Sequence, residues 1–152
     1  NKLLPDGENY PTIYKLYLEF LLSLESGEFT PLIIPFFKTR LLKGIGLFSE
    51  KFNCMYCEKD VLEKKSAAIN PESWEVVCGD CQHLLKNHIN EIRLFKAIIQ
   101  TRYKNLKNQA IPVSIILETD FLLNSYLKNY IGSSFKSGEL FDKSQWAQKG
   151  LI

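Results

Sequence analysis

The chain has 152 residues, 45% of them hydrophobic, and a formal net charge of +2. This length suffices for one ordinary domain with a small insert and excludes two large independent domains. The most apolar runs, LYLEFLLSL and TPLIIPFF, are short and are interrupted by Glu19 and Pro35, so we expect no membrane span and no secretory signal. Because the chain begins with Asn1 and its single methionine is Met55, we expect a fragment of a longer protein.

The charge is distributed unevenly along the chain. Residues 1–30 sum to −3, whereas residues 82–107 sum to +5. A polyanion is therefore a plausible partner of the second segment. A lysine-rich helix face that is simply solvated is the alternative interpretation of the same pattern.

Helical spacing of apolar residues predicts helices over 11–25 and 32–43. Pro11 suits the first turn of the first helix, and KGIG supplies glycines that can end the second. After the cysteines, residues 83–107 predict one long amphipathic helix. Residues 113–130 predict a further helix, or a closely spaced pair of helices, that Gly132 closes. Apolar residues of the last segment indicate that it docks on the protein: Phe135, Leu140, Phe141 and Trp146.

All four cysteines lie between these helices, as two Cys-x-x-Cys pairs separated by twenty residues: Cys54, Cys57, Cys78 and Cys81. Each Cys-x-x-Cys turn brings its two thiolates to the same face of the turn. Two such turns together supply the four ligands of a tetrahedral Zn²⁺ ion. Two disulfides or four unrelated buried thiols are the alternatives. Oxidised pairs are disfavoured without a secretion signal, and chance does not favour this spacing. The predicted fold class is therefore all-α, a helical domain with an inserted four-cysteine zinc-binding module, divided as 1–51, 52–84 and 85–152.

The zinc is expected to be structural, because four cysteines leave no open coordination position for chemistry. We expect Trp74, Val76 and Val77 to form a short strand that carries the second pair, with Trp74 covering the metal. Phe52 and Tyr56 are expected to pack in the same way.

A zinc-dependent nuclease of the His-Asn-His type has to be considered, because such enzymes also carry paired Cys-x-x-Cys turns followed by a helix. They need a histidine between the pairs as general base. Residues 58–77 contain none, while His83 and His88 follow the second pair and are expected within the long helix. We therefore expect no enzymatic activity. A function in binding is expected instead, and the nuclease and a zinc scaffold that binds only proteins remain the alternatives.

The order of these parts resembles the C-terminal region of the bacterial RecO family of recombination mediators. The run FFKTRLLKGIGL is similar to the family's helix and glycine turn before its first cysteine pair, and YLKNYIGSSFKSGELF is similar to its closing helix and Lys-Ser turn. The resemblance implies a cytoplasmic, nucleoid-associated protein of bacterial DNA repair and recombination. Such a protein binds single- and double-stranded DNA, anneals strands and works with RecR to load RecA.

The candidate DNA contacts are basic residues expected to bind phosphates: Arg93, Lys96, Arg102, Lys104, Lys107 and, from the Lys-Ser turn, Lys136. A solvated helix face is the alternative for each helix residue, and helix capping the alternative for Lys136. The resemblance also implies docking of the acidic, Phe-ended tail of single-stranded DNA-binding protein. An apolar pocket with a cationic rim would receive it, and the rim residues are predicted to be Arg40, Lys43 and Lys128.

Overall fold

The computed structural model of this chain describes residues 11–27 and 30–131. It is mostly helical, and its only sheet within those residues is a short antiparallel pair of strands. In chain order the elements are α1 (Pro11–Glu25), α2 (Ile33–Gly44), the 3-10 turn η1 (Val61–Glu63), β1 (Ala67–Ile69), β2 (Val76–Cys78), α3 (Ile89–Gln100), α4 (Tyr103–Leu106) and α5 (Val113–Ile131). The helical framework is thus confirmed, with the two strands confined to the cysteine segment.

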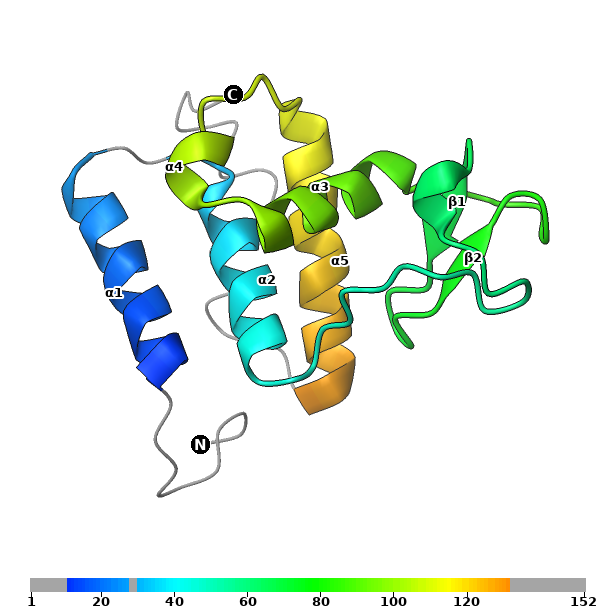
Figure 1. The fold of residues 1–152 in the computed structure, drawn as a ribbon, viewed down its shortest axis with the longest axis horizontal. Helices are drawn as coiled ribbons and strands as arrows, with labels where there is room; N and C mark the ends of the chain where they lie inside the picture. The colour runs from blue at the N-terminus through cyan, green and yellow to red at the C-terminus, as the bar shows by residue number, and fades with distance from the viewer. Residues whose placement is uncertain (1–10, 28–29, 132–152) are drawn as a thin grey trace.

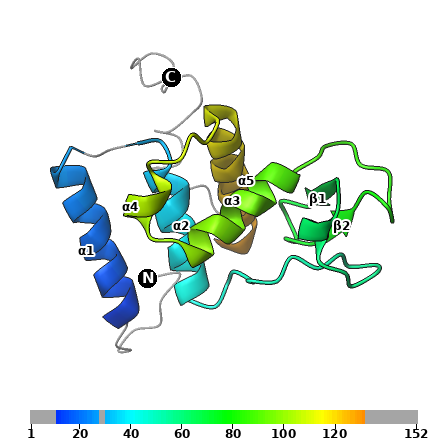
Figure 2. The same ribbon diagram turned by 45° about the horizontal axis from the view of Figure 1, so that its top comes forward.

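The helices form one body, and the cysteine segment lies at the end opposite α1 (Figures 1 and 2). α2 occupies the middle, where it packs against α1, α3 and α5. Phe20 of α1 contacts Phe37 of α2 with ring centroids 4.6 Å apart. Lys38 of α2 reaches α5, where its Nζ donates to Asp120 Oδ1 and Asn124 Oδ1 at 2.7 Å each. None of the helices in these described ranges has the length and apolar character of a membrane span.

α1 packs on one side only. None of its residues is buried. Its outer face carries exposed apolar side chains at helical spacing: Tyr14, Tyr17, Leu18, Leu21, Leu22 and Leu24. The amphipathic pattern that predicted this helix therefore includes a face that the described residues leave uncovered.

The helices and the cysteine segment share one apolar core. Phe52 and Val61 of the segment are buried in the same cluster as Phe95 of α3 and Leu122 of α5. A second cluster joins α2, α3, α4 and α5 around Leu94 and Ile98. The cysteine segment is therefore packed against the helices by burial of its own side chains.

The prediction of one helix over 83–107 is wrong at both ends. α3 begins only at Ile89, because the chain before it pairs with β1: His88 N–H donates to Ala67 O at 2.7 Å. Asn87 Oδ1 accepts from the N–H groups of Ala67 and Ile89 at 3.1 and 3.2 Å. His83 and His88 are consequently not helix residues, contrary to the prediction.

α3 also ends earlier than the pattern indicated. Thr101 and Arg102 adopt extended backbone conformations, with ψ of 145° and 147°. The Thr101 carbonyl accepts a hydrogen bond from Arg40 at 3.0 Å, so α2 holds the chain where α3 stops. The remaining predicted residues form the separate short helix α4.

Trp74 is not part of the predicted strand. β2 pairs Val76, Val77 and Cys78 with Ile69, Ala68 and Ala67 of β1. Trp74 lies in the turn before β2 and has a φ of 62°. Its N–H donates to Asn70 O at 2.8 Å, which closes this turn. Its ring packs against Phe48 and Phe95, with centroids 5.2 and 5.3 Å away, and against Tyr126 at 4.9 Å. Trp74 thus joins the cysteine segment to the helices.

Candidate metal centre

Each cysteine pair lies in a tight turn closed by backbone hydrogen bonds. In the first turn, Glu58 N–H donates to Cys54 O at 2.8 Å, and Cys54 N–H donates to Lys59 O at 2.9 Å. Glu58 has φ of 59°, which lets the chain reverse directly after Cys57. In the second turn, Cys81 N–H donates to Cys78 O at 3.1 Å at the end of β2. The two turns belong to different parts of the chain, and β2 brings them together.

The four sulfur atoms converge. They all lie within 4.8 Å of one another, and Cys57 Sγ is 3.8 Å from Cys78 Sγ. A tetrahedral zinc ion with Zn–S bonds of about 2.3 Å requires sulfurs about 3.8 Å apart. The arrangement of the donor atoms therefore fits a tetrahedral metal ion that all four predicted cysteines bind.

The surroundings of the sulfurs lower the pKa of one thiol and raise the pKa of another. Burial alone would raise the pKa of Cys54, but backbone N–H groups of Cys78, Cys57 and Tyr56 point at its sulfur and lower the pKa to about 6. Hydrogen bonds with the side chains of Cys78 and Cys57 raise the pKa of Cys81 to about 12.

The second turn is closely packed and is bordered by cations. A Cβ atom at Gly79 would overlap Ser66 Oγ and would lie 3.3 Å from Ser66 Cβ, so any residue other than glycine requires Ser66 to shift. Lys64 Nζ pairs with Asp80 Oδ2 at 2.7 Å. The hydrogen bond from Lys64 lowers the pKa of the Asp80 carboxyl, and the positive charges of Lys59 and Lys65 lower it further. Lys64 therefore places a positive charge near the sulfurs of Cys78 and Cys57, whose negative charge raises its pKa after the larger effect of Asp80.

The predicted DNA contacts lie on two helices and in the chain between and after them, not on one continuous helix. Arg93 is exposed on α3 with its NH1 3.4 Å from Asn90 Oδ1, and Lys96 Nζ donates to Glu50 O at 3.4 Å. Arg102 precedes α4 and Lys104 lies within it, both exposed, while Lys107 follows it and is half-buried. Lys136 lies outside the described residues, as do the apolar residues of the predicted docking tail.

The structure brings two of the three predicted rim residues together. Arg40 and Lys43 lie one turn apart on α2, and Lys43 Nζ pairs with Glu50 Oε1 at 2.8 Å. Arg40 donates to Thr101 O at 3.0 Å and its guanidinium lies 5.5 Å from the centroid of the Phe36 ring. Lys128 is in the last turn of α5 and exposed.

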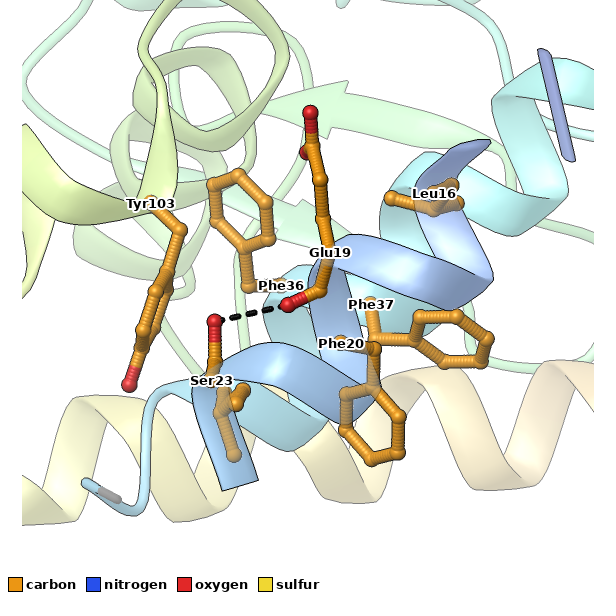
Figure 3. Close-up of a pocket in the computed structure, with 8 residues that line it drawn as sticks. Leu16, Glu19, Phe20, Ser23, Phe36, Phe37 and Tyr103 are labelled. Atoms are coloured by element: carbon orange, nitrogen blue, oxygen red, sulfur yellow. Dashed lines mark hydrogen bonds between the residues drawn. The ribbon is translucent and has the colours of Figure 1, made fainter. Parts of the chain in front are cut away.

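An apolar cleft lies where α1 meets α2 (Figure 3). Phe36, which Arg40 covers, is one of its walls, and Tyr103 of α4 is another. Ser23 donates to the carbonyl of Glu19 at 2.8 Å, which leaves the serine hydroxyl engaged with its own helix. The lining residues are Leu16, Glu19, Phe20, Ser23, Ile33, Phe36, Phe37 and Tyr103.

Glu50 was not singled out by the sequence analysis. It follows α2 by six residues and contacts cations from two helices, Lys43 through its carboxylate and Lys96 through its carbonyl. No motif marks such a residue, because its partners are distant in sequence. The sequence showed only that a glutamate lies between α2 and the first cysteine.

These features define a helical protein that carries a four-cysteine module able to hold a metal ion. Residues 1–139 match the family described as the C-terminal part of recombination protein O, and the chain belongs to that family.

Relatives support this assignment. Proteins named DNA repair protein RecO from two strains of Leptospira biflexa serovar Patoc are 33% identical over 137 residues, which is 90% of this chain and 55% of theirs. The protein of that name from Thermoanaerobacter sp. (strain X514) is 21% identical over 150 residues, 95% of this chain and 59% of its own. The chain thus spans somewhat over half the length of these relatives. No solved structure matches it.

Proposed function

We propose that this chain is the zinc-carrying helical part of a bacterial recombination mediator that binds DNA. Membership of the recombination protein O family is the observation that carries the proposal. The matched relatives are longer than this chain, which spans 55% of the Leptospira protein. We therefore propose strand annealing, cooperation with RecR and loading of RecA in the cytoplasm for a protein of that full length.

The proposed metal is Zn²⁺, held by Cys54, Cys57, Cys78 and Cys81. Sulfurs within 4.8 Å of one another support a tetrahedral four-thiolate site. Bound there, zinc would cross-link the two turns and would offer no open position for a substrate. The proposed role is therefore structural, in a module over 52–84 between helical parts 1–51 and 85–152.

Zinc content tests this part of the proposal. The reduced chain purified with zinc should hold about one equivalent, and replacing Cys57 and Cys81 by serine should abolish binding. Fewer than about 0.2 equivalents in the unsubstituted chain would contradict a four-thiolate site.

The proposed DNA contacts bind phosphates without reading sequence. Exposure of Arg93, Arg102 and Lys104 supports them, and Lys96, Lys107 and Lys136 complete the proposed set. Affinity for single-stranded DNA should then fall linearly with salt on a log–log scale, with a slope of about −0.7 per phosphate neutralised.

The test is fluorescence anisotropy of a labelled single-stranded oligonucleotide across a salt series. Replacing Arg93 and Arg102 by glutamine should weaken binding and flatten the slope. Absence of salt-dependent binding by the unsubstituted chain, together with retained binding of a protein partner, would favour the scaffold alternative. Metal-dependent cleavage of the oligonucleotide would favour the nuclease.

A second candidate function is capture of the acidic, Phe-ended tail of single-stranded DNA-binding protein. The cleft of Figure 3 supports it, because Arg40 lies over Phe36, an apolar wall of that cleft. Lys43 and Lys128 are the other proposed cations. Reversing the charge of Arg40 together with Lys128 should abolish binding of an acidic peptide ending in Phe, and unchanged affinity would remove both from the site.

A further inference from the structure

Glu50 is held between the cations of two helices. Its Oε1 lies 2.8 Å from Lys43 Nζ of α2, and its carbonyl oxygen accepts from Lys96 Nζ of α3 at 3.4 Å. A local turn presents it, because Lys51 N–H donates to Ser49 Oγ at 3.1 Å. The glutamate therefore lies at a fixed position where α2 and α3 approach each other.

The negative charge of Glu50 is stabilised by the surrounding cations. The hydrogen bond and charge of Lys43 lower the pKa of the Glu50 carboxyl, with smaller contributions from Lys96 and Arg40, so it is ionised at neutral pH. Arg40 lies one turn before Lys43, and its guanidinium is held by the Thr101 carbonyl. Three cations thus act on one carboxylate.

The same cations are reachable from solvent. The Glu50 side chain is 56% exposed and that of Lys43 is 31% exposed. An exposed ion pair of this kind has little net stability, so another anion can replace the carboxylate at small cost. Arg93 lies one turn before Lys96 on the exposed side of α3 and extends the row of cations.

We propose that the Glu50 carboxylate occupies a phosphate position of the DNA-binding surface, and that a backbone phosphate displaces it from Lys43 when single-stranded DNA binds. This inference rests on the proposed function and adds Arg40 and Lys43 to the DNA contacts. A row of cations on two helices suits the repeated charges of a nucleic-acid backbone. Arg93 and Lys96 lie on α3 and are not among the residues that line the apolar cleft, so a row that includes them favours a nucleic-acid backbone over a peptide seated in that cleft.

The test is Glu50→Gln, which keeps the side-chain shape and removes the competing charge. Glu72→Gln is the matched control, because Glu72 is exposed in the turn between β1 and β2 and gives the same change in net charge. At low salt, Glu50→Gln should bind a labelled thymidine 20-mer about two- to fivefold more tightly than the unsubstituted chain. The control should change affinity by less, and the gain should shrink as salt rises.

A second variant checks the mechanism. In a Lys43→Gln background, Glu50→Gln should produce a smaller gain, because the cation for which phosphate and glutamate compete is absent. Thermal unfolding and zinc content of every variant establish that the fold is retained.

The outcomes separate this inference from the proposed function. If the unsubstituted chain binds DNA and Glu50→Gln gains no more than the control, displacement of Glu50 is refuted and DNA binding stands. If neither chain binds DNA, both proposals fail. If Glu50→Gln strengthens binding of the acidic peptide alone, the cations belong to a peptide site and the inference is overturned.

Discussion

His88 illustrates how one side chain connects the cysteine segment to α3. It is 6% exposed, and its Nδ1 accepts from Ile69 N–H at 3.1 Å, which requires that nitrogen to be unprotonated. Burial lowers the pKa of His88; the charge of Lys86 lowers it further and that of Glu118 opposes the shift. The folded chain therefore favours the neutral imidazole.

We predict a loss of stability on acidification that depends on His88. The pKa of His88 is lower in the folded chain than in the unfolded chain. Its contribution to stability is therefore fully present above the unfolded value of about 6.5, and it is lost as the pH falls from there through the lower, folded pKa. His88→Asn keeps an acceptor for Ile69 N–H and should flatten the decline of unfolding free energy between about pH 7 and pH 5. Urea unfolding at several pH values measures it.

His83→Asn is the control for this prediction, because His83 is exposed in the segment before α3. An identical pH dependence in all three would contradict a titrating role for His88.

At the scale of elements, three helices were predictable to within a residue and one was not. The bounds of α1, α2 and α5 follow from periodicity and from turn residues close in sequence. Residues 83–88 have the same apolar spacing, but Asn87 and His88 bond to Ala67 instead of continuing the helix. Sequence periodicity cannot report a competing partner twenty residues away.

The same distinction applies to the candidate site. Cys-x-x-Cys spacing is local and predicted which sulfurs converge. The contacts of Trp74 depend on Phe48, Phe95 and Tyr126, which lie on three other segments, so its role as a link to the helices was not predictable. Glu50 was missed for the same reason.

We predict that Trp74 couples the cysteine segment to α3 without affecting the sulfurs directly. Trp74→Ala should lower the free energy of unfolding by on the order of 2 to 4 kcal/mol, because it removes an indole packed on three rings. Zinc stoichiometry in excess metal should remain unchanged. Trp74→Phe retains a ring and should cost less, as measured by urea unfolding followed by circular dichroism; an equal cost would contradict a packing role.

At the scale of the whole molecule, the two ends differ in character. The cysteine segment shares its core with the helices, whereas α1 at the other end has exposed apolar residues on its outer face. An apolar face of this kind should bind a hydrophobic dye in the isolated chain.

We predict that Leu22→Lys reduces binding of the dye anilinonaphthalene sulfonate and changes the free energy of unfolding by no more than about 0.5 kcal/mol. Leu22 is 61% exposed, so little packing is lost. Phe20→Lys is the contrasting variant, because Phe20 packs on Phe37 of α2, and it should destabilise the fold. Dye fluorescence and thermal unfolding measure both effects; equal destabilisation by the two variants would contradict a one-sided α1.

The bonds between β1 and the start of α3 have a consequence for how the molecule opens. The amides of Ile69 and His88 are donors in two of the three hydrogen bonds that join these segments. Neither amide can exchange its proton with solvent until that junction separates. Their exchange rates, followed as zinc is withdrawn, would therefore show whether the first turn of α3 detaches with the cysteine segment or only when the remaining helices unfold.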